Sequence, residues 1–162
     1  MFFAGLMALI PVLDLTMKSG IESQRDEAYP KTVLGTGGKV QLRKLHNPGF
    51  PLGVLKEKKN IVMHLPLAVT SALFLRFSSL LPKKGRSGEK LGLALCIGGS
   101  LSNLFDRFFR GYVVDYLYVD TAPLNKVVFN LGDMGIASGA VVTALSALIS
   151  PKGPGKDGTS GR

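Results

Sequence analysis

A chain of 162 residues has the length of one domain, and its 20 basic and 11 acidic residues give a formal net charge of +9. This charge would suit a nucleic-acid partner, but no basic and aromatic binding motif accompanies it, so we expect no nucleic acid. Hydrophobic residues make up 46% of the chain and the mean hydropathy is +0.25, which is high for a soluble protein with so many charges. The charges gather in short connectors between long apolar tracts. This pattern is typical of a protein that crosses a membrane several times, with its basic residues contacting anionic membrane lipids.

The first apolar tract covers about residues 1–17. No basic segment precedes it and no small-residue cleavage site follows it, so we interpret it as a retained membrane-spanning helix. Asp14 and Lys18 lie four residues apart near its end, in the order that favours an ion pair along a helix near the membrane surface.

Residues 19–59 form the longest polar stretch. Within it, Lys31–Leu45 has two β-prone runs on either side of Gly-Thr-Gly-Gly, which predicts a β-hairpin. The prolines and glycines that follow His46 exclude a regular helix there. We therefore expect a small β-containing unit outside the membrane and not a second domain.

Three further apolar tracts predict membrane-spanning helices at about 61–81, 91–105 and 127–149. Small residues recur in the third tract at Gly88, Gly92, Gly98 and Ser102, and in the fourth at Gly135 and Gly139, which predicts close approach of helices. The expected fold is thus mainly α: a four-helix transmembrane bundle with a small β-containing unit outside the membrane, all within one domain of residues 1–150.

The connector 82–90 carries four basic residues, which indicates the cytoplasmic side. With four spans, both termini then lie in the cytoplasm of a multi-pass membrane protein. Lys56, Lys58 and Lys59 on the other side run against this rule. The Gly- and Pro-rich tail, residues 151–162, predicts disorder.

Polar residues inside the apolar tracts are the candidates for chemistry. Gly99, Asn103 and Arg107 are spaced by four and share one helix face, with Asp106 on the same side. The carboxylate of Asp115 lies in the apolar, aromatic run 112–117. Two carboxylates in apolar surroundings, here Asp115 and Asp133, suit an acid–base pair.

Each of these residues also has a structural interpretation. Asn130 and Asp133 have the spacing of a helix cap and a first-turn acid. Asp115 could pair with Arg107 or Arg110, and Asp106 could form an interfacial ion pair. The aromatic residues of this region favour an aromatic belt at the membrane surface: Phe108, Phe109, Tyr112, Tyr116 and Tyr118.

Two other kinds of site have little support. His46 and His64 have no Cys, Glu or third His at ligand spacing, so no metal site is expected. No serine stands in a G-x-S-x-G turn or has a histidine partner, which leaves serine-type catalysis without support.

The joint pattern resembles the lipoprotein signal peptidase (signal peptidase II) family, the membrane aspartic proteases of bacteria. The resemblance covers about residues 10–142 and is carried by five motifs: Leu13-Asp14-Leu15-Thr16-Met17-Lys18, His46-Asn47-Pro48-Gly49, Gly98-Gly99 with Asn103-Leu104 and Asp106-Arg107, Gly111–Tyr116, and Phe129-Asn130-Leu131-Gly132-Asp133.

This resemblance implies an aspartic endopeptidase that removes signal peptides from diacylglyceryl-modified prolipoproteins, cutting before the lipidated cysteine, without cofactor or metal. It also implies that the β-containing unit is a small extracytoplasmic β-cradle. Asp115 and Asp133 would be the catalytic pair. The residues matched around the active site would bind substrate, with Arg107 and Asn103 holding backbone carbonyls: Asn47, Asn103, Arg107 and Asn130. A further set would support the structure: Asp14, Lys18, Gly99 and Asp106.

The chain departs from the family pattern at three places. Gly132 replaces a common alanine, Ser102 replaces a common glycine, and Phe50–Gly53 differs from the usual small residues followed by phenylalanine. Two other functions stay open. One is a catalytically inactive or divergent membrane interaction protein of the same fold. The other is a transport role for the buried acids, against which the four short helices and the lack of an inverted repeat argue.

Overall fold

The computed structural model describes residues 2–50, 54–55 and 57–149, so the predicted tail at 151–162 lies outside the described residues. Four long helices account for most of this part of the chain: α1 (Phe2–Glu22), α2 (Lys59–Leu80), α3 (Ser87–Phe109) and α4 (Leu131–Ile149). The shorter elements are η1 (Asp26–Ala28), β1 (Lys31–Thr32), β2 (Val40–Asn47), β3 (Val113–Val119), η3 (Leu124–Lys126) and β4 (Val128–Phe129). The expectation of a mainly α protein with a small sheet is confirmed.

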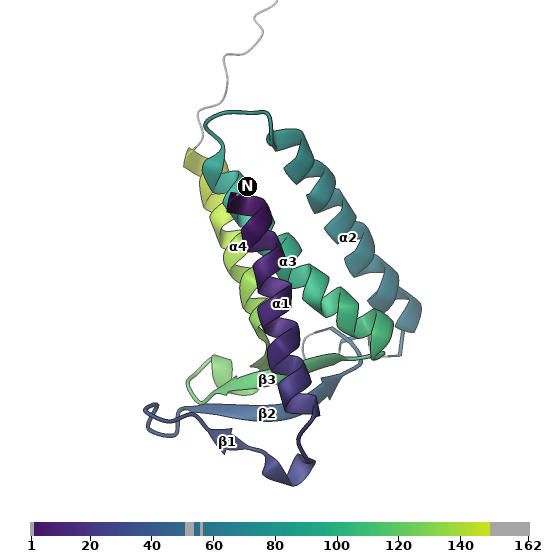
Figure 1. The fold of residues 1–162 in the computed structure, drawn as a ribbon, viewed down its shortest axis with the longest axis vertical. Coiled ribbons are helices and arrows are strands. Elements are labelled where there is room, and N and C mark those ends of the chain that lie inside the picture. Colours follow the sequence, from purple (N-terminus) through teal and green to yellow (C-terminus); the bar gives the residue numbers. More distant parts are fainter. Residues whose placement is uncertain (1, 51–53, 56, 150–162) are drawn as a thin grey trace, which may run out of the picture.

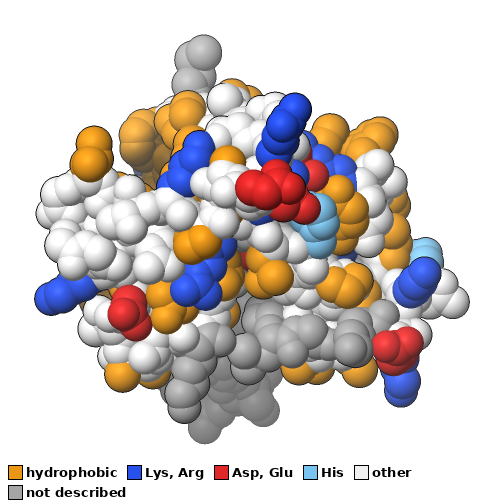
Figure 2. All heavy atoms as spheres, turned by 90° about the horizontal axis from the view of Figure 1, so that it is seen from below, with side chains coloured by type: hydrophobic (Ala, Val, Ile, Leu, Met, Phe, Trp, Pro, Cys, Tyr) orange, Lys and Arg blue, Asp and Glu red, His pale blue; other side chains and the backbone are white. Residues whose placement is uncertain are grey.

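The helices run alongside one another and the sheet crosses one end of them (Figure 1). The N-terminal end of α1, the connection between α2 and α3, and the last turn of α4 all lie at the opposite end (Figure 1). Seen from the sheet end, the surface displays Lys and Arg side chains together with Asp and Glu side chains among hydrophobic ones (Figure 2).

Three of the helices are long and apolar enough to cross a membrane, namely α1, α2 and α4. Their large apolar side chains face outward, for example Leu13 on α1, Leu75 on α2 and Leu148 on α4. Such a continuous apolar exterior is unstable in water and is what lipid contact requires.

Helix α3 is different because it is the centre of the bundle. It contacts each of the other three helices, and twelve of its 23 residues are buried. Its buried face includes Ser102, Asn103, Asp106 and Arg107. This buried face is more polar than the outward faces of the neighbouring helices. The helix therefore carries polar groups into the bundle while α1, α2 and α4 cover it.

Glycines let α3 and α4 approach closely, as the small-residue spacing predicted. A Cβ atom added at Gly139 would lie 2.5 Å from the Gly92 carbonyl oxygen and 2.7 Å from the Cys96 amide nitrogen. Nearer the sheet, a Cβ at Gly99 would collide with the backbone of Gly132. The two backbones are thus in direct contact, and this contact fixes where the first turn of α4 lies relative to α3.

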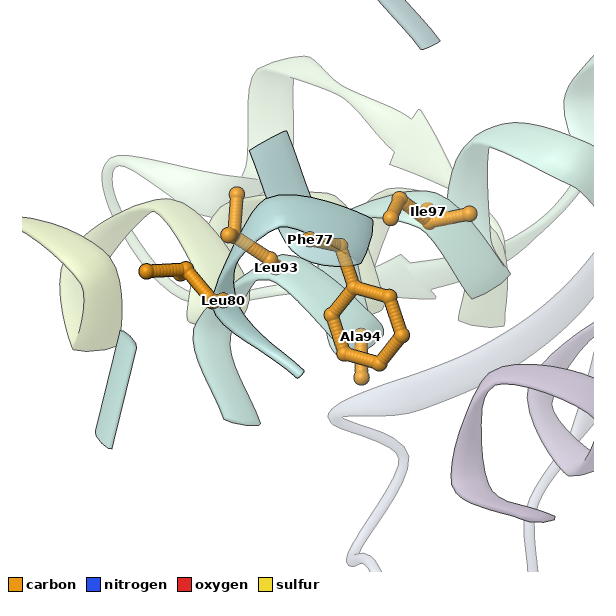
Figure 3. Packing of buried hydrophobic residues seen from close by; sticks show 5 residues of the cluster. All are labelled: Phe77, Leu80, Leu93, Ala94 and Ile97. Atoms are coloured by element: carbon orange, nitrogen blue, oxygen red, sulfur yellow. The ribbon is translucent and has the colours of Figure 1, made fainter. Parts of the chain in front are cut away.

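At the end opposite the sheet, α2 joins the bundle through a small apolar cluster (Figure 3). Phe77 and Leu80 of α2 pack there against Leu93, Ala94 and Ile97 of α3, and all five are buried. Burying a large apolar side chain stabilises a protein by about 1.5–3 kcal/mol in water. Between helices that already lie in lipid, the hydrophobic contribution is weak. Van der Waals contacts between the closely packed side chains therefore stabilise the cluster.

The sheet is antiparallel, with the strand order β1-β2-β3-β4. The first two strands form the predicted hairpin, in which Lys31 pairs with Leu42, and Gly35, Gly37 and Gly38 adopt positive φ in the turn. The central pair is β2 with β3, and it places Asn47 opposite Val113 and Leu45 opposite Asp115. The strand β3 was not among the predicted elements.

The structure corrects two predicted boundaries. The first helix continues to Glu22 and not only to about 17, so residues 19–22 do not belong to the polar loop expected at 19–59. The charge of Lys18 does not end the helix because it is buried against partner side chains. The fourth helix begins at Leu131 and not at 127, because Val128 and Phe129 pair with β3 as strand β4.

The contact between α3 and α4 yields a test of the packing. Gly139→Leu would drive a side chain into the α3 backbone, and such overpacking costs about 1–3 kcal/mol. We expect a clear drop in the unfolding midpoint in detergent micelles. Gly5→Leu on α1 is the matched control, because a Cβ there meets nothing within 4 Å. Equal midpoints for the two variants would contradict the close contact.

Candidate active site

The two predicted carboxylates line one cavity. Asp115 lies in the middle of β3 and Asp133 in the first turn of α4. The cavity has a volume of about 450 Å³, and its polar lining also includes Asn47, Asn103 and Arg107. The remaining lining is mostly apolar. It comes from the loop after β2, from the three helices α2, α3 and α4, from β3, and from β4 with the residue before it: Phe50, Pro66, Ser100, Val113, Val127, Val128, Phe129, Ile136 and Ala137.

Asn130 connects the two carboxylates from behind the cavity. Its side chain is fully buried, and its amide nitrogen donates a 2.8 Å hydrogen bond to Asp115 Oδ1. Its amide oxygen accepts from the backbone N–H of Asp133 at 2.8 Å, and the backbone N–H of Asn130 donates back to Asp133 Oδ2 at 3.2 Å. This reciprocal pair is a capping box, so the helix-cap interpretation is confirmed. The cap also fixes Asp133 relative to Asp115.

Two more asparagines complete the donors to the pair. Asn47, at the end of β2, donates from its amide nitrogen to Asp115 Oδ2 at 3.0 Å. Asn103 of α3 donates to Asp133 Oδ1 at 2.8 Å. Each of the four carboxylate oxygens therefore accepts a hydrogen bond from the protein. The alternative that Asp115 pairs with Arg107 or Arg110 finds no such contact among the described residues.

Arg107 holds the loop after β2. Its side chain is only 9% exposed and donates to the carbonyl oxygens of Asn103, at 3.2 Å, and Gly49, at 3.1 Å. Its guanidinium carbon lies 5.8 Å from the centre of the Phe50 ring. Its Nε is buried and has no hydrogen-bond partner within the described part of the chain. A buried donor on a cavity wall is suited to donate a hydrogen bond to a carbonyl oxygen of a ligand.

Behind these residues lies a buried ionic network. The Lys18 ammonium is fully buried and contacts Asp14 at 2.8 Å and Asp106 at 3.0 Å. It also donates to Ser102 Oγ at 3.2 Å and to Asn103 Oδ1 at 2.9 Å. The predicted ion pair of Asp14 and Lys18 is confirmed, and both side chains are fully buried in the protein interior. Asp106 pairs with Lys18 and Arg110 and not with Arg107.

The network reaches the strand and the fourth helix through Asp14. Its Oδ1 accepts from the Tyr116 hydroxyl at 2.9 Å and from the Leu131 backbone N–H at 3.0 Å. Its Oδ2 accepts from Ser102 at 2.6 Å. Asp106 in turn accepts from the backbone N–H of Val114 at 3.1 Å. The support residues therefore position the neighbours of both carboxylates, namely Val114 and Tyr116 around Asp115, and Leu131 near Asp133.

Two members of this network escaped sequence reasoning. The sequence predicts Tyr116 in a surface aromatic belt, but its side chain is 4% exposed and its hydroxyl donates to Asp14. The available signal was its strand alternation with Val114, which places both residues inside. Ser102 was treated as a small packing residue, yet its hydroxyl bridges Lys18 and Asp14.

Burial raises the pKa of Asp115 to about 6, and the neighbouring Asp133 carboxylate adds to the rise. The hydrogen bonds from Asn47 and Asn130 act in the opposite direction. A carboxyl group of this kind can hold a proton near neutral pH, which an acid catalyst needs. Within the described residues, no group of three or more His, Cys, Asp or Glu side chains could hold a metal ion.

Comparison with known proteins places this chain in a family. The sequence model described as "Signal peptidase (SPase) II" matches residues 6–149. The chain belongs to the signal peptidase II family. A member from Moorella thermoacetica, named lipoprotein signal peptidase, is 32% identical over 96% of this chain and 98% of its own length. A second, from Streptomyces griseus and with the same name, is 31% identical over 91% of this chain and 72% of its own length.

Solved structures agree with the fold of this signal peptidase II family member. A bacterial membrane enzyme solved in meso at 2.3 Å resolution superposes with a TM-score of 0.75 and 18% identity, over 91% of this chain and 87% of its own. Another, at 1.9 Å, gives a TM-score of 0.74 with 18% identity, over 93% and 94% of the two chains. At this identity the likeness concerns the fold.

The raised pKa of Asp115 predicts a pH-dependent stability. Below the ordinary value of 3.8 the group is protonated in both the folded and unfolded states and has no effect. Above about pH 6 the folded protein must carry a disfavoured charge, at a cost of about 3 kcal/mol. Relative to the wild type, we expect Asp115→Asn to gain unfolding free energy, by up to about this amount, from pH 4 to 7.

Chemical denaturation in micelles at several pH values measures this difference. Asp120→Asn, at an exposed carboxylate, is the control and should track the wild type. If the difference in unfolding free energy between Asp115→Asn and wild type stays constant with pH, the folded protein does not raise the pKa of Asp115.

Proposed function

We propose that this protein is a membrane endopeptidase that removes signal peptides from prolipoproteins. The family match over residues 6–149 and relatives named lipoprotein signal peptidase, one of them similar over nearly its whole length, support this function. The observation that carries the chemistry is the pair of carboxylates on one cavity, buried Asp115 and half-buried Asp133, which Asn130 joins.

The proposed mechanism is of the aspartic type. Two carboxyl groups on one cavity share a single proton, because two like charges in apolar surroundings do not both ionise. The ionised member takes a proton from a water molecule as the water oxygen bonds to the scissile carbonyl carbon, and the protonated member gives its proton to the carbonyl oxygen. The resulting tetrahedral intermediate breaks at its C–N bond when the leaving nitrogen receives a proton. No covalent enzyme adduct forms.

The neighbouring polar residues hold the pair and the substrate. Asn47, Asn103 and Asn130 donate to the carboxylate oxygens, so their role is to fix the geometry of the two acids. Arg107 has a buried Nε without a partner among the described residues, and we assign it to a backbone carbonyl of the substrate. An extended peptide near lipid has carbonyls that water does not reach, so such a donor stabilises the bound state.

The cavity lining suits a substrate that lies partly in the bilayer. Pro66 of α2, Ile136 of α4 and Phe129 of β4 form apolar walls next to the carboxylates. A signal peptide and the acyl chains of a diacylglyceryl-modified cysteine both lie in lipid, so a cut before that cysteine requires acids at membrane depth. Membrane lipids are therefore the surroundings of the reaction, and this chemistry needs no metal or cofactor.

For the topology, we propose a single domain of residues 1–150 with four spans, α3 being the fourth although it is the most polar. The N-terminal end of α1 and the last turn of α4 lie at the same end as the basic connector 82–90 (Figure 1). The positive-inside rule then favours cytoplasmic termini in a bacterial cell membrane and an extracytoplasmic sheet. The mixed charges of the sheet end suit a surface in water (Figure 2).

The competing interpretation is a catalytically inactive membrane protein of the same fold. A chain that had lost catalysis would be free to lose the donors around the acids. Here each carboxylate oxygen keeps its hydrogen-bond donor, from Asn47, Asn103 and Asn130. This complete set favours the enzyme.

Cleavage of a lipid-modified prolipoprotein by the purified protein, read as a mass shift of the substrate, tests the proposal. We expect Asp115→Asn and Asp133→Asn each to lose activity by about 10²–10⁴-fold, because each removes one partner of the proton transfer. Both variants should remain folded in micelles. Asp120→Asn, which changes an exposed acid in the same way, should keep wild-type activity.

Two results would contradict the proposal. Normal cleavage by either Asp115→Asn or Asp133→Asn would exclude the paired-acid mechanism. Failure of the wild-type protein to cleave a lipid-modified precursor in micelles or in bilayers would favour the inactive membrane protein.

A further inference from the structure

A line of two hydrogen bonds connects a buried cation to one carboxylate of the pair. The Lys18 ammonium donates to Asn103 Oδ1 at 2.9 Å, and Asn103 Nδ2 donates to Asp133 Oδ1 at 2.8 Å. Lys18 is fully buried and Asn103 is 6% exposed, so little water screens this line. A cation on the oxygen of an amide polarises the amide and strengthens the donation from its nitrogen.

Asp115 has no equivalent connection. Its donors, Asn47 and Asn130, use their amide oxygens to accept the backbone N–H groups of Gly49 and Asp133. Three asparagines thus donate to the two carboxylates. Of their three amide oxygens, only that of Asn103 accepts a hydrogen bond from a charged group, the Lys18 ammonium. Asp133 also lies in the first turn of α4, where the helix dipole favours an anion. The two carboxylates are therefore held in unequal surroundings.

The other charges around the pair lie on α1, on α3 and at the residue directly after α3. Lys18 and Asp14 face it from α1, and Asp106 and Arg107 face it from α3, with Arg110 following α3 and pairing with Asp106. Arg107 lies near both acids, but within the described part of the chain it donates to backbone carbonyls and not to either carboxylate. These groups comprise three cations and two anions besides Asp115 and Asp133. The cluster is neutral when the pair carries one proton.

We propose that Lys18 is a positioning residue that acts through Asn103 to keep Asp133 as the ionised member of the pair, with the shared proton on Asp115. The inference rests on the proposed function for its role in catalysis, but the unequal protonation is a property of the folded protein alone.

This assignment gives each acid its part in the reaction. The Asp133 carboxylate takes one proton from water as the new C–O bond forms, and Asp115 gives its proton to the carbonyl oxygen. When the C–N bond breaks, Asp133 returns its proton to the leaving nitrogen, and Asp115 regains a proton from a hydroxyl of the intermediate. The pair then has its starting charge, so no other acid or base is consumed.

The test removes the cation without leaving an unpaired buried charge. In Lys18→Met/Asp14→Asn, one cation and one anion are lost together, and Asp106 keeps Arg110 at 2.6 Å as its partner. The matched control is Asp14→Asn, which retains Lys18. In the pH profile of kcat/KM, we expect the acidic limb of the double variant to move up by about one pH unit relative to the control. An acidic limb that coincides with that of the control would overturn the proposal.

A second readout needs no activity. Infrared titration of the carboxyl band follows Asp133 in an Asp115→Asn background and Asp115 in an Asp133→Asn background. Adding Lys18→Met/Asp14→Asn should move the midpoint upward more in the first background than in the second. Equal shifts of the titration midpoint in the two backgrounds would overturn the proposal. If the midpoints behave as expected while the wild type cleaves no lipoprotein precursor, the proposed function fails and the Lys18 assignment stands.

Discussion

The structure depends on a fully buried lysine, Lys18. An isolated ammonium in a protein interior costs several kcal/mol, so Lys18 requires anions and acceptors from whatever surrounds it. These come from Asp14 on its own helix and from Ser102, Asn103 and Asp106 on α3. Removing Lys18 alone would leave the buried Asp14 carboxylate without its cation, whereas Asp106 would keep Arg110. The contacts of Lys18 therefore connect α1 to α3. Asp14 and Asp106 extend this network to β3 and to the start of α4.

The position of the two candidate catalytic acids follows from this network. Asp14 binds Tyr116 and the backbone of Leu131, while Asp106 binds the backbone of Val114. Asp115 lies between Val114 and Tyr116 on β3, and Asp133 lies two residues beyond Leu131. Asn130 then sets the spacing between the acids by bonding to both residues. The price is polarity within the membrane-facing bundle, which α3 carries at its centre and the apolar outer helices cover.

Local pattern was enough to predict much of this arrangement. The four apolar tracts indicated the helices, and the glycines at 35–38 indicated the hairpin, because turn residues act over a few positions. The acids stood out as polar residues in apolar runs. Family resemblance, and not spacing, brought Asp115 and Asp133 together, because they come from different elements. Long-range pairing explains what was missed: β3 needs β2 from some 70 residues away, and Tyr116 looked like a surface aromatic until Asp14 supplied its partner. An i,i+4 pair such as Asp14 and Lys18 has the same sequence signature at a surface and in a core.

The central claim is that Asp115 and Asp133 act as one unit on one water molecule. A crystal structure at a resolution that resolves ordered water, from crystals grown in lipid, tests it most directly. The account predicts a single water within hydrogen-bond distance of one oxygen from each carboxylate. Separate water molecules on the two acids, or a direct ion pair between Arg107 and either acid, would contradict it.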